Sequence, residues 1–335
     1  MKKILLIFIV CCMLFFLLYT VIANRDKIIK IKEDSAKGFN YTYFLYIPAY
    51  IDKSKSNRVM VECNNTGSHN ESMTEGLTKE QLKGTGGYKL ASSLAIPFVF
   101  PAFPRPADGP YSGVYTHDLG RAAMLIPSGD KLGRIDLQMA AMIKDAQRRL
   151  EAEGINIESR VLLYGFSASS HFANRFALMH PDMVRAVAAG GINSLPALPV
   201  PEWNDTKLRY PLGISDLKNI SGINFKMDEY KKVSQYIFMG DSDTNDTAAA
   251  GDCFEEQDTG IIYNLFGVKQ VPDRFNTMKD IFSRLDLPAQ FVLYKNVGHQ
   301  GLAGKIFDDV VDFFNKNSGS EGILTMVNYH ESPLD

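Results

Sequence analysis

The residues of this sequence best suited to chemistry surround Ser167. Residues 165–169 read Gly-Phe-Ser-Ala-Ser, between the short apolar run 161–164 and a helix-like pattern that Phe172 and Phe176 mark. Small flanking residues let a serine occupy a strained turn between a strand and a helix, with its hydroxyl exposed above a sheet. The first N–H groups of the helix then point to where an oxyanion would develop. The pattern predicts a nucleophilic serine, although such a short motif alone is common by chance.

Two further polar sites come directly after predicted strands. The aspartate-rich turn 240–246 follows the apolar run 235–239, and His299 follows the run 291–294. In an open α/β sheet, ligands bind at the carboxyl ends of the strands. A nucleophilic serine needs an imidazole to take its proton, and the imidazole needs a carboxylate to fix its tautomer. The order of Ser167, an aspartate of the turn and His299 supplies all three groups.

The elements that must position these groups alternate between strand-like and helix-like patterns. Strands are expected at residues 27–32, 41–47, 58–63, 96–103, 161–164, 184–189, 235–239 and 291–294, and helices at 135–154, after Ser167, at 275–285 and at 306–314. This alternation implies an α/β fold with a mostly parallel sheet, covered by helices on both faces, after two antiparallel opening strands. Residues 194–232 have several prolines and no clear period, and are expected to form an inserted, lid-like excursion.

The length and composition of the chain favour one large domain. With 335 residues, 45% of them hydrophobic, the chain can bury a sizeable core, which we expect at residues 27–320. A segment 1–26 precedes this domain, and a tail 321–335 follows it. The net charge of -2, with no basic run and no glycine-rich phosphate loop, argues against nucleic-acid and nucleotide partners.

The N-terminal segment has the pattern of an export signal. Two lysines precede residues 4–23, which carry no charge. This run exceeds the ~7–15 residues of a cleaved signal core and is close to the ~20 that span a bilayer, so a signal peptide and a membrane anchor both stay open. Either predicts an extracytoplasmic protein, secreted or anchored to the outer face of the plasma membrane. In the exported part, Cys63 and Cys253 either pair or are two buried free thiols.

The three polar sites together resemble the α/β-hydrolase superfamily over roughly residues 40–317, and within it the secreted esterase and polyester-depolymerase branch. The resemblance implies the α/β-hydrolase fold and a Ser-His-Asp triad that needs no cofactor. By this resemblance Ser167 is the nucleophile, His299 is the general base and then acid, and Asp243 orients His299. The motif departs from the usual pattern at Ser169, where many relatives have glycine, but a small residue still fits.

The acidic turn leaves alternatives open. Asp246 and Asp241 could serve as the acid in place of Asp243. A calcium loop is a second interpretation, because four residues have its ligand spacing: Asp241, Asp243, Asn245 and Asp252. Against calcium, Asp246 stands where that loop needs glycine, and no helix precedes the turn.

The resemblance also implies an oxyanion hole and a substrate pocket. The hole would pair the backbone N–H of Ala168 with one from the loop after the third strand, where residues 64–67 read Asn-Asn-Thr-Gly and Asn65 is the candidate. An apolar acyl or aromatic pocket would be lined by Phe103, Tyr111, Trp203 and Tyr210.

The function expected from these features is an exported serine hydrolase that cleaves small-molecule or polymeric carboxylic esters through an acyl-enzyme. A peptidase or acyltransferase could use the same groups. A non-catalytic extracellular binding protein on this scaffold is the alternative from another class, against which the full set of Ser167, Asp243 and His299 argues. His171, one helical turn beyond Ser167, could contact the serine but is expected to pack against the sheet.

Overall fold

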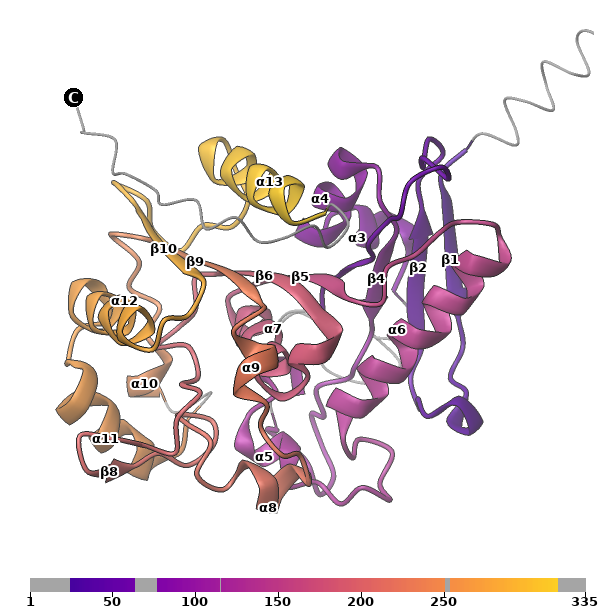
Figure 1. The fold of residues 1–335 in the computed structure, drawn as a ribbon. Helices are drawn as coiled ribbons and strands as arrows, with labels where there is room; N and C mark the ends of the chain where they lie inside the picture. The colour runs from indigo at the N-terminus through magenta and orange to yellow at the C-terminus, as the bar shows by residue number, and fades with distance from the viewer. Residues whose placement is uncertain (1–24, 64–76, 115, 251–253, 319–335) are drawn as a thin grey trace, which may run out of the picture.

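The structure is a computed structural model that describes residues 25–63, 77–114, 116–250 and 254–318, built around one sheet (Figure 1). Its strand order is β1-β2-β4-β3-β5-β6-β9-β10. The strands are β1 (Lys27–Ile31), β2 (Tyr43–Ile47), β3 (Met60–Val61), β4 (Phe98–Pro101), β5 (Val161–Phe166), β6 (Val184–Gly190), β9 (Ser234–Gly240) and β10 (Ala289–Tyr294). Strand β2 pairs antiparallel with β1 and β4, and the other pairings in this sheet are parallel. The predicted α/β class is confirmed.

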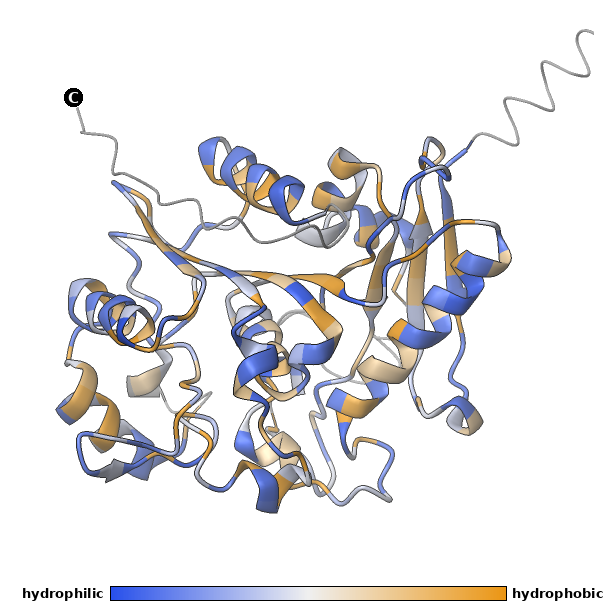
Figure 2. Cartoon of the chain, in the orientation of Figure 1, coloured by the Kyte–Doolittle hydropathy of each residue, from blue (hydrophilic) through white to orange (hydrophobic). Residues whose placement is uncertain are grey.

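Helices cover both faces of the sheet (Figure 1). On one face lie α3 (Lys79–Lys83), α4 (Gly86–Leu94) and α13 (Lys305–Ser318). On the other lie α5 (Arg121–Met124), α6 (Ile135–Ala152), α7 (Ala168–Met179), α10 (Thr247–Ala250), α11 (Glu256–Phe266) and α12 (Phe275–Arg284). In Figure 2 the side of α13 toward the sheet is hydrophobic and its outer side hydrophilic. Such a stripe arises from apolar residues at helical spacing, as with the buried Ile306, Val310 and Phe313.

The third strand is shorter than the expected 58–63. Met60 and Val61 pair with β4 and β5, and hydrogen bonds continue the ladder one residue either way, from Leu162 N to Val59 O at 2.9 Å and from Glu62 N to Val99 O at 3.2 Å. The predicted run therefore lies in the sheet, and its formal ends fall where the pairing loses its regular pattern.

The segment 194–232 is folded into the body of the protein. It contains a hairpin of β7 (Glu202–Trp203) and β8 (Thr206–Lys207), followed by α8 (Leu217–Ser221) and α9 (Met227–Tyr230). Its leucines at 195, 198, 208 and 212 are buried in the same core cluster as residues of α11 and α12. These short elements carry no helical or strand period, so the sequence alone predicted an excursion without internal structure.

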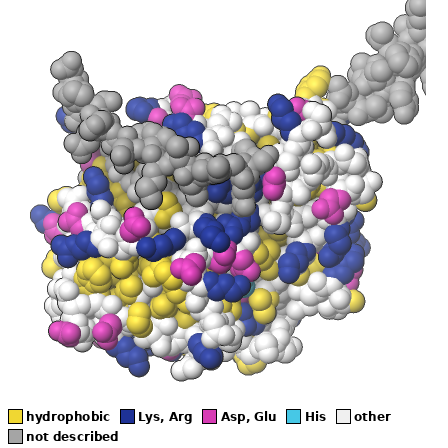
Figure 3. All heavy atoms as spheres, viewed as in Figure 1, with side chains coloured by type: hydrophobic (Ala, Val, Ile, Leu, Met, Phe, Trp, Pro, Cys, Tyr) yellow, Lys and Arg dark blue, Asp and Glu magenta, His cyan; other side chains and the backbone are white. Residues whose placement is uncertain are grey.

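The described surface is mixed in character. In Figure 3, charged side chains of both signs are spread over the face, and hydrophobic ones gather on the left, where Figure 1 places α10 to α12. Within the described residues, no helix is both long and apolar enough to cross a membrane. The predicted export segment 4–23 and the tail 321–335 lie outside the described residues.

Candidate active site

Ser167 stands at the junction of β5 and α7 in a backbone conformation that few non-glycine residues adopt. Its φ is 59° and its ψ is −129°. Its N–H donates to Gly190 O of the neighbouring β6 at 2.9 Å, which ties the turn to the sheet. Strained φ/ψ values cost on the order of 1–3 kcal/mol and persist only where the surroundings impose them. Ser167 thus lies in a strained turn between a strand and a helix, as the sequence pattern predicts.

Two neighbours explain why the turn can form. A Cβ atom on Gly165 would lie 2.2 Å from Ser169 O, so a side chain at 165 would force the backbone apart. The Ser169 hydroxyl donates to Phe166 O at 2.9 Å and accepts from Phe166 N at 3.0 Å, which closes the turn around Ser167. Serine therefore supplies at position 169 two hydrogen bonds that the glycine of the usual pattern cannot.

His299 and Asp243 meet at the carboxyl ends of β9 and β10. His299 Nδ1 lies 2.8 Å from Asp243 Oδ2; the Asp243 side chain is 1% exposed and that of His299 28%. The His299 ring packs on Phe166, with ring centroids 4.7 Å apart. A Cβ on Gly240 would lie 2.0 Å from Val297 O. Only glycine therefore lets the aspartate-rich turn 240–246 approach the loop that carries His299 this closely.

The other ring nitrogen of His299 contacts an amide. Asn245 Nδ2 lies 3.1 Å from His299 Nε2. Asn193, just after β6, satisfies all its neighbours when its nitrogen donates to Gly191 O at 2.8 Å and to Asn245 O at 2.9 Å, and its oxygen accepts from Asn245 Nδ2 at 3.1 Å. The Asn193 atom 3.3 Å from Ser167 Oγ is then the oxygen, to which the serine hydroxyl donates.

The remaining aspartates of the turn have other partners. Asp246 forms an ion pair with Arg274, a fully buried residue at the end of η4 (Gln270–Arg274). Asp241 accepts from Asn296 N at 2.8 Å and from the hydroxyl of the adjacent serine at 2.9 Å. Of the three, Asp243 is the one hydrogen-bonded to His299.

The predicted calcium ligands do not all fall within the described residues. Asp252 lies outside them, and the other three have protein partners: Asp241 accepts from Asn296 N, whereas Asp243 and Asn245 contact the two ring nitrogens of His299. In the described part of the chain, no group of three or more histidine, cysteine, aspartate or glutamate residues is arranged to hold a metal ion.

Only one half of the predicted oxyanion hole lies in the described residues. Ala168 is the first residue of α7, directly after Ser167, whereas Asn65 falls in the segment 64–76. Glu62, just before that segment, is buried, and this burial raises its pKa to about 8. Its Oε2 accepts from Gly87 N near the start of α4 at 2.5 Å. Cys63 is a buried free thiol beside Met139, and Cys253 lies outside the described residues.

Of the four residues predicted to line a substrate pocket, three belong to or pack against one core cluster, and Trp203 packs against another. Phe103 stacks on Phe172 in the core, and the buried Tyr210 donates from its hydroxyl to Leu119 O. The Tyr111 hydroxyl donates to Asp130 at the surface. Trp203 is in the β7–β8 hairpin and packs against a different core cluster from the one that holds Phe103 and Tyr210. The structure does not bring these four side chains together.

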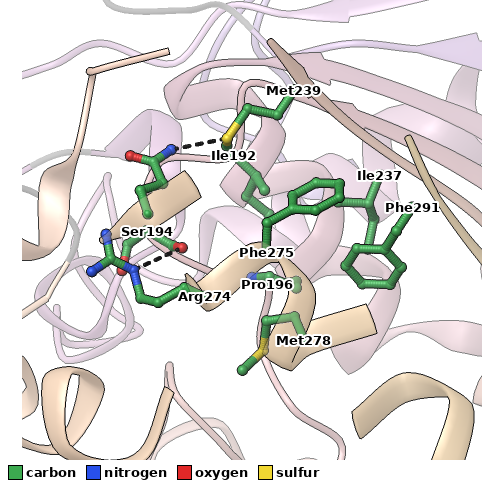
Figure 4. A pocket seen from close by; sticks show the side chains of 10 residues that line it. Ile192, Ser194, Pro196, Ile237, Met239, Arg274, Phe275, Met278 and Phe291 are labelled. Atoms are coloured by element: carbon green, nitrogen blue, oxygen red, sulfur yellow. Dashed lines mark hydrogen bonds between the residues drawn. The ribbon is translucent and has the colours of Figure 1, made fainter. Parts of the chain in front are cut away.

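A small cavity lies beside Arg274 (Figure 4). Its volume is about 10 Å³, and Arg274 Nε donates to Ser194 O there at 3.4 Å. Gln270 is a further polar residue of the lining, and the rest is apolar, with Ile192, Ile237, Met239, Phe275, Met278 and Phe291 among its residues. This volume suits a single water molecule, so the cavity is not a substrate pocket.

His171 is a core residue. Burial lowers its pKa well below the ordinary value, and its ring meets the edge of Phe254 at a centroid distance of 6.0 Å. The amides of Asn193 and Asn245 are the contacts that the sequence did not indicate. Asn245 could be weighed only as a calcium ligand, and Asn193 follows a strand end without any motif.

Comparisons with known proteins bear on the fold. The chain matches no protein-family model and no curated protein sequence. Among solved structures it is similar to poly(aspartic acid) hydrolase-1 from Sphingomonas sp. KT-1, with 14% identity, a TM-score of 0.53, and coverage of 82% of this chain and 94% of that one. It also matches S-formylglutathione hydrolase from Agrobacterium tumefaciens, with 14% identity, a TM-score of 0.46, and coverage of 88% of this chain and 95% of that one.

A third match is fluorophosphonate-binding serine hydrolase F of Staphylococcus aureus, with 13% identity, a TM-score of 0.46, and coverage of 87% of this chain and 98% of that one. At these identities the likeness concerns the fold and leaves the chemistry open. The mostly parallel sheet and the serine turn between β5 and α7 agree with the likeness to the Sphingomonas protein. The resemblance seen in the sequence is thus confirmed at the level of architecture, and the chain has the α/β-hydrolase fold.

Proposed function

We propose that the protein is a serine hydrolase that cleaves carboxylic esters through an acyl-enzyme. One observation carries the proposal: the strained Ser167 and the hydrogen-bonded pair of His299 and Asp243 lie at the carboxyl ends of strands of one parallel sheet. Strain in a serine backbone and a buried carboxylate behind an imidazole are features that catalysis needs and packing does not.

In the proposed reaction Ser167 Oγ attacks the ester carbonyl while His299 Nε2 takes its proton. Asp243 holds the Nδ1 proton of His299 and stabilises the imidazolium that forms. The N–H of Ala168 stabilises the tetrahedral oxyanion together with a donor that we assign to Asn65. His299 then protonates the leaving alcohol, and water, activated by the same imidazole, hydrolyses the acyl-enzyme.

Amide cleavage is the second candidate. The Sphingomonas protein is by name a poly(aspartic acid) hydrolase, and its polymer substrate is joined by amide bonds. The same serine, histidine and aspartate could act on an amide if the leaving amine is protonated efficiently. Ester and amide versions of one chromogenic substrate, compared by kcat/KM, separate the two candidates.

We further propose that the enzyme works outside the cytoplasm, with residues 4–23 as a signal peptide or membrane anchor. The two lysines before this uncharged run support it. Fractionation of expressing cells, combined with the N-terminal sequence of the mature protein, tests this proposal. Full-length protein in the soluble cytoplasmic fraction would contradict it.

A fluorophosphonate probe tests the chemistry without knowledge of the natural substrate. The folded wild-type protein should be labelled at Ser167, and the Ser167→Ala variant should not. Ser93→Ala is a suitable control, because Ser93 is an exposed serine of α4, on the other face of the sheet from α7. A folded wild-type protein that is not labelled would refute the enzyme proposal and favour a binding protein on this scaffold.

A further inference from the structure

The nitrogen of His299 that must accept the serine proton is already engaged. Asn245 Nδ2 is 3.1 Å from His299 Nε2, and it also donates to Asn193 Oδ1 at 3.1 Å. Ser167 Oγ in turn donates to Asn193 Oδ1 at 3.3 Å. A chain of hydrogen bonds thus runs from Asp243 through His299, Asn245 and Asn193 to Ser167. Among the described residues, Asn193 is the partner of the Ser167 hydroxyl, and no hydrogen bond joins that hydroxyl to His299.

The chemistry of the amide fixes the state of the ring. An amide N–H can only donate, so Nε2 faces it with its lone pair, and the ring proton resides on Nδ1 against Asp243. That is the tautomer a general base needs. The same contact, however, occupies the lone pair that Ser167 must reach. The side chain of Asn245 therefore stands where the serine hydroxyl would be in the reactive arrangement.

Resting on the function proposed above, we propose that Asn245 is a positioning residue whose amide occupies the lone pair of His299 Nε2 in the resting enzyme. This hydrogen bond must break before His299 can deprotonate Ser167. Asn193 likewise occupies the Ser167 hydroxyl through its Oδ1, and this hydrogen bond must also break. Substrate entering the site would break the contacts of both amides, so that Ser167 and His299 form their own hydrogen bond.

The position of Asn245 separates this role from a purely structural one. Asn245 is exposed, while Asn193 is buried. The acid turn is held instead by the backbone of Asn245, whose N–H donates to Asp243 Oδ1 at 2.9 Å, a bond that any residue at 245 preserves. Replacing this side chain should therefore leave the turn folded and change only its contacts with the imidazole and with Asn193 Oδ1.

Two substitutions should act in opposite directions on the rate of labelling by a fluorophosphonate. Asn245→Ala removes the competing donor, so labelling should become roughly two- to tenfold faster, the range that one net hydrogen bond supplies. Asn245→Asp puts an isosteric carboxylate beside Nε2, which favours a protonated ring that cannot act as base. Labelling at neutral pH should then fall by about tenfold or more and recover as the pH is raised.

The other groups around the His299 ring stay the same in the Asn245 variants. Asp243 contacts Nδ1, Asp246 is paired with Arg274, and Phe166 packs on the ring face, and none of these residues is changed in the variants. The control is Asn219→Ala, an exposed asparagine on α8, which should label like wild type. Thermal melting should show the same Tm for all four proteins within a few degrees.

The outcomes distinguish this inference from the function on which it rests. Faster labelling of Asn245→Ala with slower labelling of Asn245→Asp supports the role of Asn245. If wild type is labelled but Asn245→Ala is no faster, the positioning role is refuted and the serine hydrolase stands. If neither folded wild type nor folded Asn245→Ala is labelled, the proposed function fails, and the positioning role fails with it.

Discussion

The two turns that carry the proposed catalytic groups are built by different means. The nucleophile turn, 165–170, spans the junction of β5 and α7, and backbone contacts, the Ser169 hydroxyl and the missing side chain at Gly165 hold it. The acid turn, 240–246, is more exposed than the nucleophile turn, and the individual partners of its side chains decide its geometry. A turn whose backbone is fixed by steric contacts has one possible geometry. A turn with several similar carboxylates can place any one of them beside His299. The sequence pattern therefore predicts the nucleophile turn, whereas it leaves open which aspartate of the acid turn contacts His299.

The largest expected effect tests which carboxylate acts on His299. Asp243→Asn should reduce kcat for a short-chain nitrophenyl ester by roughly 10³- to 10⁴-fold, because the amide no longer favours the required tautomer. Asp241→Asn is the matched control, since its side-chain oxygen can still accept from Asn296 N, and it should retain nearly full activity. An active Asp243→Asn enzyme would move the acid role to another residue of the turn.

The nucleophile turn should break through its backbone. Gly165→Ala places a methyl group 2.2 Å from Ser169 O, so the turn must open and Ser167 must move. A displacement of about 1 Å at a reacting group costs on the order of 100-fold in rate. Fluorophosphonate labelling measures the loss. Gly260→Ala, in α11 with open space around its Cβ, should be harmless, and equal losses in the two variants would contradict this account.

Asp246 should matter more for stability than for rate. Asp246→Asn leaves the buried guanidinium of Arg274 without its carboxylate, which should cost roughly 3 kcal/mol in the free energy of unfolding. Denaturant titration measures that cost, and kcat of the folded variant should fall by less than about tenfold. A rate loss as large as that of Asp243→Asn would instead make Asp246 the functional acid.

The smallest effect on activity is expected at Glu62, beside the segment of the predicted oxyanion donor. Burial raises the pKa of folded Glu62 to about 8 from the ordinary 4.5, so in this range the unfolded chain ionises while the folded protein stays protonated. This residue's contribution to stability is full below pH 4.5 and falls by up to about 1.4 kcal/mol per pH unit up to about pH 8. Glu62→Gln should flatten the dependence of unfolding free energy on pH, and identical slopes would refute a buried neutral carboxyl.

Much of the fold could be predicted because its signals are local. The apolar runs that became β5, β6 and β9 alternate with helices of clear period, such as α6 and α12. Other elements escaped prediction. The helix α11 begins with a capping box between Glu255 and Asp258, which lacks the usual pattern of serine or threonine followed by glutamate or glutamine. Each strand of the β7–β8 hairpin is two residues long, and Trp203 packs against a core cluster. No local sequence pattern predicts this tertiary contact.

By itself the sequence determined the α/β architecture, the serine turn and the order of the three polar sites, because spacing and residue size act along the chain. Only the tertiary structure decided that Asp243, and not Asp246, meets His299, since a buried arginine distant in sequence binds Asp246. It alone also set Asn245 and Asn193 between the imidazole and the serine. Partner choice among chemically similar side chains depends on which loops meet in space, and that meeting is a property of the whole fold.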